Sequence, residues 1–227
     1  MKKNYFITGG TGSFAKKYIE YLINNKAAKK IIIFSRDEYK QSVLKNTEFV
    51  KKNKNIFRFF IGDVRDKNRL DWAINEDIDI LVHSAALKQV PTTEYNPFET
   101  VQTNVIGTQN IVEICLKKQI AKCCLISTDK AVSPINLYGS TKLTAEKLFI
   151  TANLFAGKNR SKFSVVRYGN VMGSRGSVIP ILLKQNTNKE DFTITDKRMT
   201  RFNITLNEAV KFVNNCINKM QGKEIFI

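Results

Sequence analysis

Short apolar runs alternate with amphipathic stretches along most of this chain. Six of the runs are rich in Ile, Val or Phe and predict strands over residues 5–7, 31–34, 57–61, 78–82, 122–126 and 163–166. The segments between them have the length and spacing of helices, at residues 13–24, 38–52, 67–75, 97–118 and 137–154. Strands and helices in this order form a doubly wound parallel sheet covered by helices on both faces, so we expect an α/β fold.

The pattern loosens after Arg167. A short helix is predicted near residues 179–183, a strand at 192–195 and a helix at 206–220. Such interruptions late in the chain usually build a part that covers the substrate. The chain stops in an apolar, strand-like run at residues 224–227, which indicates a shortened chain or a naturally minimal form.

Length, composition and charge limit the number of domains and the kinds of partner. With 227 residues and 43% hydrophobic content, the chain can bury the core of one domain. The formal net charge of +17 comes from lysines scattered over helix ends and turns, and no nucleic-acid motif accompanies them. We interpret the charge as a solvated basic surface, with a docking patch as the alternative, and expect no nucleic-acid partner.

The cysteines and the N-terminus indicate a compartment. Cys115, Cys123, Cys124 and Cys216 lack the paired spacing of a zinc or redox site, so we expect reduced, buried thiols and no metal. The first apolar run is too short for a signal peptide, and none approaches the ~20 residues of a membrane span. We therefore expect a cytoplasmic protein without a membrane span.

A glycine-rich turn follows the first strand. Gly9, Gly12 and Ala15 have the spacing G-x-x-G-x-x-A and lead into the first helix. The two glycines let the backbone turn tightly and approach a pyrophosphate, which the free N–H groups and partial positive charge of the helix N-terminus attract. Ala15 needs only to be small for close packing. This strand, turn and helix predict a Rossmann dinucleotide site.

The end of the second strand bears on the choice of cofactor. Ser35 stands where an acid would bind the ribose 2′-hydroxyl, and Arg36 can contact a 2′-phosphate. We therefore expect NADP rather than NAD, although Asp37 could still turn inward to a ribose.

Further candidates follow the third and fourth strands. Asp63 and Val64 match an adenine-contacting position, although Asp63 could equally be a turn residue. The small residues Ser84, Ala85 and Ala86 would let a cofactor lie against the chain. His83, the only histidine, is interpreted as a packed strand-end residue rather than an acid or base.

Tyr138 and Lys142 lie four residues apart at the start of a helix, so both project from one face. Lys142 can bond the nicotinamide ribose and lower the pKa of Tyr138, which could then accept a proton from a sugar hydroxyl. The alternative is a surface Tyr-Lys pair. Asp129 and Lys130 follow the fifth strand, where catalytic side chains are expected, and the alternative for them is a solvated ion pair.

These motifs resemble a known family over nearly the whole chain. The resemblance is carried by TGGTGSFA, SRDEYKQ, IGDVRD, HSAALKQVP, STDKAVSPINLYGSTK, VVRYGNVMGSRGSV and ITDKRMTRF. They are similar to the inverting UDP-N-acetylglucosamine 4,6-dehydratases of the extended short-chain dehydrogenase/reductase family, which serve pseudaminic acid and capsular polysaccharide synthesis. In that extended family, sugar 4-epimerases generally lack the Asp-Lys pair, dTDP-glucose 4,6-dehydratases carry Asp-Glu, and long membrane-bound relatives lack the catalytic tyrosine. Asp129-Lys130 with Tyr138 therefore indicates the short, C5-inverting type.

The resemblance implies how water would be removed from UDP-N-acetylglucosamine. Tyr138 would deprotonate the C4 hydroxyl while NADP takes the C4 hydride. Lys130 would remove the C5 proton, Asp129 would protonate the departing C6 hydroxyl, and the hydride would return to C6. Reprotonation of C5 on the opposite face would invert that centre. Thr128 completes the predicted catalytic set.

The resemblance also implies binding residues, carried over position by position. The cofactor shell comprises Gly9, Thr11, Gly12, Ser13, Phe14, Ser35, Arg36, Asp37, Lys40, Asp63, Val64, Ser84, Ala85, Ala86, Thr103, Asn104, Tyr138, Lys142 and Val171, with residues Val171 to Arg175 crossing between nicotinamide and sugar. The substrate contacts are Lys88, Tyr138, Asn170, Val178 and Thr195. Arg201 is either a further contact or a structural arginine.

Two departures from the family are visible. Ala15 replaces the last glycine of its turn, which costs little because alanine is small. The family also continues beyond the point where this chain stops, and that part supplies further uridine-diphosphate contacts. We therefore expect residues 1–168 to form the NADP-binding domain with the catalytic residues, and residues 169–227 a partial, truncated substrate-binding region. The family further implies a homo-oligomer.

Two other functions stay open. A UDP-sugar 4-epimerase or reductase would share every feature except Asp129-Lys130. A truncated, inactive NADP-binding module would bind the cofactor without turning over a sugar.

Overall fold

A computed structural model of the chain describes residues 1–74, 77–157, 161–174, 178–192 and 196–227. Within these residues, the centre is a seven-stranded sheet of order β3-β2-β1-β4-β5-β6-β9. Its strands are β1 (Lys3–Thr8), β2 (Ala28–Ser35), β3 (Phe57–Ile61), β4 (Ile80–His83), β5 (Lys122–Ile126), β6 (Lys162–Val166) and β9 (Ile225–Phe226). All neighbours pair in parallel, and the order reverses between β1 and β4, as in a doubly wound Rossmann sheet.

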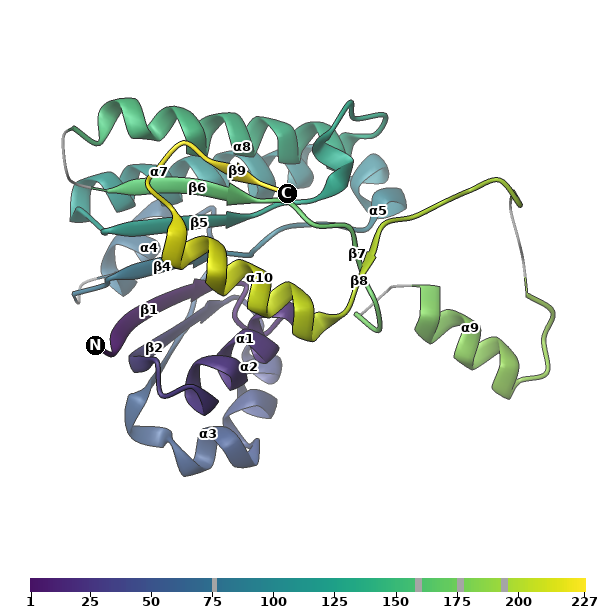
Figure 1. Cartoon of the computed structure of the whole chain (residues 1–227), viewed down its shortest axis with the longest axis horizontal. Helices are drawn as coiled ribbons and strands as arrows, with labels where there is room; N and C mark the ends of the chain where they lie inside the picture. Colours follow the sequence, from purple (N-terminus) through teal and green to yellow (C-terminus); the bar gives the residue numbers. More distant parts are fainter. Residues whose placement is uncertain (75–76, 158–160, 175–177, 193–195) are drawn as a thin grey trace.

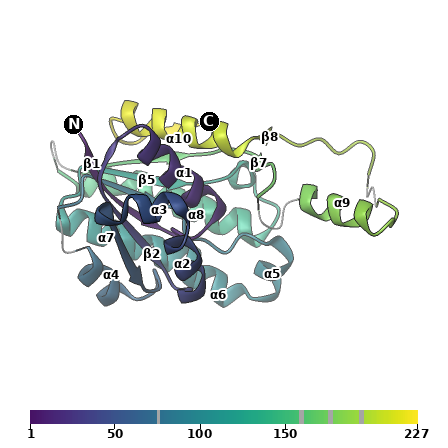
Figure 2. The ribbon, with the colours of Figure 1, turned by 90° about the horizontal axis from the view of Figure 1, so that it is seen from below.

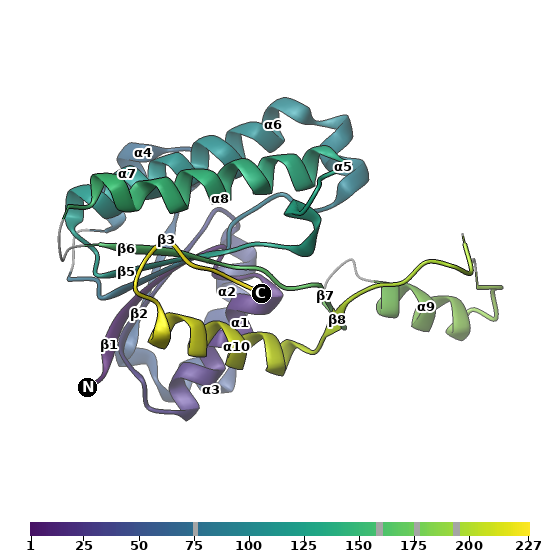
Figure 3. The same cartoon turned by 45° about the horizontal axis from the view of Figure 1, so that its top comes forward.

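Helices cover both faces of the sheet (Figures 1 and 3). One face carries α1 (Ser13–Asn24), α2 (Glu38–Lys45), α3 (Glu48–Lys52) and α10 (Leu206–Lys219). The other carries α4 (Lys67–Ala73), α5 (Val90–Tyr95), α6 (Pro97–Val101), α7 (Gly107–Lys118) and α8 (Leu137–Phe155). Short 3₁₀ helices span Lys54–Ile56 and Asp129–Ala131, and a π-helical turn, Gln102–Ile106, joins α6 to α7.

Strand side chains alternate between two apolar clusters. Phe6 and Ile32 pack with residues of α7 and α8, whereas Tyr5, Ile7 and Ile31 pack with residues of α1 and α10. Alternation with period two sends successive side chains to opposite faces. Because both faces are covered, most strand side chains are apolar, which is why their pattern was readable in the sequence.

The six predicted strands are confirmed, with ends that differ by a few residues. The helix predicted over residues 38–52 is instead two helices. Thr47 ends the first, since its backbone N–H and its hydroxyl both donate to Leu44 O, at 3.1 and 2.6 Å. Its extended backbone then starts α3.

The C-terminal third differs more from the prediction. β9, within the strand-like run expected at residues 224–227, pairs with β6 as a seventh strand, whereas α5, earlier in the chain, was not predicted. The helix predicted at 179–183 is the longer α9 (Val178–Thr187). Of the strand predicted at 192–195, Phe192 is not in a strand, and residues 193–195 lie outside the described part, as does Asn75 at the end of a predicted helix.

An arm, described over residues 169–174, 178–192 and 196–205, lies beyond the carboxyl edge of the sheet and leads into α10. Its base is a two-stranded parallel ladder of β7 (Asn170–Val171) and β8 (Asn203–Ile204). Asn170 N–H donates to Phe202 O at 2.8 Å, and Met172 N–H donates to Ile204 O at 2.9 Å. α9 lies out along the arm, away from the sheet (Figures 1 and 2).

The four cysteines are unpaired and buried, as predicted. Burial raises the pKa of the Cys123 and Cys124 thiols well above the ordinary value and that of Cys216 to about 11. Helices in the described part of the chain all fall short of the length and apolar character that a bilayer crossing needs.

His83 connects three elements inside the sheet. Its Nδ1 lies 2.7 Å from Thr8 Oγ1 on β1, and its Nε2 lies 3.1 Å from Thr108 Oγ1 on α7. The Thr108 hydroxyl donates to Asn104 O at 2.6 Å, so His83 donates from Nε2 and accepts at Nδ1. Burial, reinforced by the charge of Lys142, lowers the pKa of His83 from 6.5 to about 3. His83 is therefore a neutral packed residue.

This buried histidine predicts a pH dependence of stability. Below pH 6.5 the unfolded chain binds a proton at His83 that the folded chain does not, so the free energy of unfolding falls as pH falls toward 3. Between pH 7.5 and pH 5, we expect the natural chain to lose about 2 kcal/mol more than His83→Gln. Urea titrations of both proteins at the two pH values measure the difference, and equal losses would contradict it.

Candidate functional site

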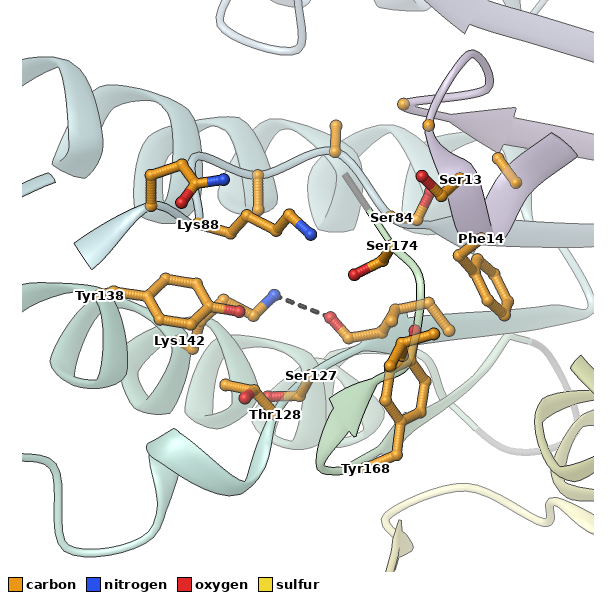
Figure 4. Close-up of a pocket in the computed structure, with 18 of the residues that line it drawn as sticks. Ser13, Phe14, Ser84, Lys88, Ser127, Thr128, Tyr138, Lys142, Tyr168 and Ser174 are labelled. Atoms are coloured by element: carbon orange, nitrogen blue, oxygen red, sulfur yellow. Dashed lines mark hydrogen bonds between the residues drawn. The ribbon is translucent and has the colours of Figure 1, made fainter. Parts of the chain in front are cut away.

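A cavity of about 990 Å³ lies at the carboxyl ends of the strands, bounded by the loops that follow β1 to β6. Figure 4 shows the Lys88 and Tyr138 side chains projecting into it from opposite sides. The predicted site residues that line it are Gly9, Thr11, Gly12, Ser13, Phe14, Ser35, Arg36, Lys40, Asp63, Val64, Ser84, Ala85, Ala86, Lys88, Thr103, Thr128, Lys130, Tyr138, Lys142, Asn170 and Val171. Arg201, for which both a substrate contact and a structural role were considered, also lines the cavity.

Five predicted residues are placed differently. Asp37, Asn104 and Asp129 do not line the cavity themselves, although each contacts residues around it. Val178 begins α9, but its side chain lies outside the described part of the chain, and Thr195 lies outside the described residues altogether.

The glycine turn approaches the loop after β4 closely. Gly9 has φ +62°, and a Cβ there would lie 2.9 Å from Ala85 Cα. Gly12 donates its N–H to Gly9 O at 2.8 Å and caps α1 without a side-chain hydrogen bond. Ala15 is fully buried in the next turn. Only glycine satisfies both the backbone angle and the contact at position 9.

Cations rather than carboxylates face the cavity after β2. The Ser35 hydroxyl is held by Gln41 Nε2 at 3.0 Å, and Arg36 and Lys40 line the space beside it. Asp37, which could have turned inward, caps α2 instead: its carboxylate accepts from Lys40 N–H at 2.9 Å and pairs with the Lys40 ammonium. This edge of the cavity therefore suits an anionic group.

Asp63 follows β3 and is tied to Arg65, whose Nη2 lies 2.8 Å from its carboxylate, with Arg36 at 3.5 Å. Partial burial raises the pKa of Asp63, but the hydrogen bonds from Arg65 outweigh it, and the net effect is a lowered pKa. Val64 is buried against Gly107, where an added Cβ would meet Val64 Cγ2 at 2.6 Å. Asp63 is thus both a cavity residue and an ion-pair partner.

The loop after β4 is fixed from two sides. Ser84 N–H donates to Thr8 Oγ1 at 3.1 Å, and its hydroxyl donates to Thr8 O at 2.6 Å. Asn104 accepts from Leu87 N–H at 2.8 Å and donates to Leu87 O at 2.9 Å. Asn104 therefore positions this loop, and the π-helical turn that presents it also presents Thr103 to the cavity.

Thr103 carries an unpaired polar atom. Its hydroxyl oxygen is buried and has no hydrogen-bond partner among the described residues. A buried hydroxyl without a partner is costly, and at a cavity wall it is available to a bound molecule.

Tyr138 and Lys142 project from the first turns of α8 toward the end of β5 (Figure 4). Lys142 is 3% exposed, and its ammonium donates to Ile126 O at 2.8 Å. Burial lowers the pKa of Lys142 to about 8, with Glu146 opposing. Burial raises the pKa of Tyr138 to about 12, although a hydrogen bond with Thr128 works against it. The predicted lowering of the Tyr138 pKa by Lys142 is therefore absent from this arrangement, because burial dominates.

Asp129 and Lys130 form a partly buried pair rather than a solvated one. Their charged groups lie 3.2 Å apart, with side chains 28% and 33% exposed. Asp129 accepts from the Thr128 hydroxyl at 2.9 Å, and Lys130 donates to Asn170 Oδ1 at 2.9 Å. The pair thus joins the loop after β5 to β7, with the Lys130 ammonium on the cavity side.

Comparisons with known proteins agree with this geometry. A family model described as polysaccharide biosynthesis protein matches residues 5–227. The chain belongs to this family. A relative from Campylobacter jejuni, named UDP-N-acetylglucosamine 4,6-dehydratase (inverting), is 51% identical over 99% of this chain. The chain spans about two thirds of that relative's length, 66%.

Two further proteins bear on the site. A relative from Rickettsia bellii named UDP-glucose 4-epimerase is 42% identical over 99% of this chain and 65% of its own length. The solved structure of Pen from Bacillus thuringiensis superposes with a TM-score of 0.91 at 40% identity, covering 97% of this chain and 69% of that one. The Pen structure therefore has the same fold as this chain over nearly its whole length.

Sequence reasoning missed several lining residues of this family member. Tyr168 follows β6 and packs its ring against Phe14, with centroids 6.2 Å apart. Its place after a strand was a usable signal. Met172 and Ser174, within the predicted segment 171–175, also line the cavity. No pattern marks the further lining residues that the loop after β4, the arm and the start of α10 contribute: Gln89, Val90, Pro91, Ile179, Met199, Asn203 and Leu206.

The close approach at Gly9 predicts a stability effect. In Gly9→Ala, the alanine would have to adopt a left-handed backbone conformation, and its Cβ would clash with Ala85. Because both effects destabilise the folded chain, we expect the free energy of unfolding to fall by about 3 kcal/mol. Gly157→Ala is the matched control, because Gly157 also has positive φ, +67°, but a Cβ there meets no described atom within 4 Å. It should cost only about 1 kcal/mol. Thermal and urea unfolding measure both, and equal losses would contradict the predicted contact.

Proposed function

We propose that this chain is the catalytic part of an NADP-dependent 4,6-dehydratase that acts on UDP-N-acetylglucosamine and inverts C5. The observation that carries the proposal is one cavity that holds Tyr138 with Lys142 on one side and the Lys130 ammonium, paired to Asp129, beside them. The name of the Campylobacter jejuni relative supports the reaction. Dehydration across C5 and C6 needs two separate proton-transferring groups, and these residues provide them.

The cavity fits a dinucleotide cofactor on two observations. Gly9 leaves no room for a Cβ where a pyrophosphate would approach the backbone, and the Thr103 hydroxyl lacks a partner within the described residues. Arg36 and Lys40 support NADP over NAD, since both cations line the space beside Ser35 while Asp37 is engaged as a helix cap.

Bound NADP⁺ would accept the C4 hydride, return it to C6 and place a positive charge near Tyr138. Tyr138 takes the C4 hydroxyl proton, which needs that charge and the Lys142 ammonium because burial alone holds the Tyr138 pKa at about 12. A proton passed from the Lys130 ammonium to the Asp129 carboxylate, whose atoms lie 3.2 Å apart, would leave an amine and a carboxylic acid. Once C4 is a ketone, the C5 proton is acidic, and the Lys130 amine removes it and becomes an ammonium again. Asp129, which contacts Lys130 and Thr128, gives its proton to the departing C6 hydroxyl, which leaves as water. Protonation of C5 on the opposite face, after hydride has returned to C6, completes the inverted product.

The arm and α10 belong to the sugar-nucleotide side in this proposal. Lys88 and Asn170 contact the sugar, and Met199, Arg201 and Asn203 line the same end of the cavity. Residues 1–168 then bind the cofactor and perform the chemistry, while residues 169–227 contribute to substrate binding.

The Lys130 assignment is directly testable. We expect Lys130→Ala to bind NADP⁺ as the natural chain does but to lose at least about 100-fold in formation of the 4-keto product, because general-base catalysis contributes on that scale. Lys147→Ala removes an exposed lysine of α8 as the control. Turnover is followed by NMR with UDP-N-acetylglucosamine and NADP⁺, and full activity of Lys130→Ala would exclude it as the base.

A 4-epimerase is the second candidate, favoured by the name of the Rickettsia bellii relative. Turnover in deuterated water separates the two, since a dehydratase incorporates deuterium at C5 and an epimerase does not. NADP⁺ binding without turnover would instead support an inactive module.

Cofactor preference gives a further test. We expect Arg36→Ala to weaken NADP⁺ binding by about 10-fold or more and to leave NAD⁺ binding little changed, because the lost contact is a charge-assisted hydrogen bond to the 2′-phosphate. Arg58→Ala, on the edge strand β3, is the control. Calorimetric titrations with both cofactors measure the effect, and a natural chain that binds NAD⁺ as tightly as NADP⁺ would contradict the preference.

A further inference from the structure

A buried carboxylate holds the ends of β5 and β6 together. Glu146, on α8, has a side chain only 1% exposed, and it accepts from Arg167 Nε at 2.9 and 3.1 Å and from Arg167 Nη2. It also accepts from the Ser127 hydroxyl. Ser127 is the first residue after β5 and Arg167 the first after β6, so one side chain anchors both strand ends.

Each anchored residue leads directly into a loop of the site. Ser127 precedes Asp129 and Lys130, and Arg167 precedes Asn170. The two loops are joined again further out, where Asp129 N–H donates to Tyr168 O at 3.2 Å and Lys130 donates to Asn170 Oδ1. Movement of either strand end would therefore displace the Lys130 ammonium relative to Tyr138.

Glu146 also lies one helical turn from Lys142. Tyr138, Lys142 and Glu146 are spaced four residues apart and form one stripe on α8. The direct hydrogen-bond acceptor of Lys142 is neutral, the carbonyl of Ile126. Its buried positive charge is consequently stabilised at longer range.

Among the titratable groups around Lys142, Glu146 is the one whose negative charge favours the Lys142 ammonium. His83, on β4, is neutral, and Tyr138 and Tyr168 are held protonated by burial. Arg167, after β6, is paired with Glu146, and Asp129, after β5, is paired with Lys130. Glu146 opposes the effect of burial on the pKa of Lys142.

We propose that Glu146 is a positioning residue of this site, which fixes the loops after β5 and β6 through Ser127 and Arg167 and keeps the Lys142 ammonium charged. The inference rests on the proposed function, because it takes Lys142 to face a bound NADP⁺. Since NADP⁺ carries net negative charge, its affinity should fall where Lys142 loses its proton.

The test is NADP⁺ affinity between pH 6 and pH 9, measured by calorimetry on the whole chain. For the natural chain we expect affinity to fall as pH rises through about 8. In Glu146→Gln, which keeps the shape but not the charge, the midpoint should move down by about one pH unit or more. Glu48→Gln makes the same change in net charge on an exposed part of α3 and should leave the midpoint in place.

A double variant distinguishes the loss of the Glu146 charge from unfolding of the chain. Glu146→Gln leaves Arg167 without its partner, which can unfold the chain, whereas Glu146→Gln with Arg167→Met removes both charges. The double variant should regain stability and keep the lowered midpoint. An unshifted midpoint in the folded variants would overturn the inference, while a natural chain that fails to bind NADP⁺ at any pH would overturn the proposed function instead.

Discussion

Parallel pairing of the strands is the constraint from which the site follows. Because all seven strands of the described sheet run the same way, their carboxyl ends meet at one edge. The loops that follow β1 to β6 therefore share a cavity, although Gly9 and Asn170 are far apart in the sequence. Helices on both faces keep water from the strands, so the polar side chains gather at this edge and not within the sheet.

Much of this arrangement was readable from the sequence, because it depends on local signals. Apolar runs marked six strands, and strand-end positions marked Ser35, Asp63 and Ser84. The structural roles of Asp37 and Asn104 were not readable, since an N-cap and a paired amide depend on which backbone groups lie nearby in space. β7 and β8 are two residues each, too short for any pattern. The raised pKa of Tyr138 likewise depends on burial, which a Y-x-x-x-K spacing does not contain.

Two charged side chains are buried in the interior of the site. Lys142 and Glu146 are almost fully buried, and they are tolerated because backbone carbonyls and an arginine supply their hydrogen bonds. His83 is buried beside them but stays neutral, so it adds hydrogen bonds without adding charge.

The ladder between β7 and β8 gives the arm a fixed base. Asn170 and Asn203 are paired in register, so the two ends of the arm lie side by side. The residues between those ends can change in length or sequence without moving Asn170 or Asn203. Variation along the arm therefore leaves Asn170 within reach of the Lys130 ammonium.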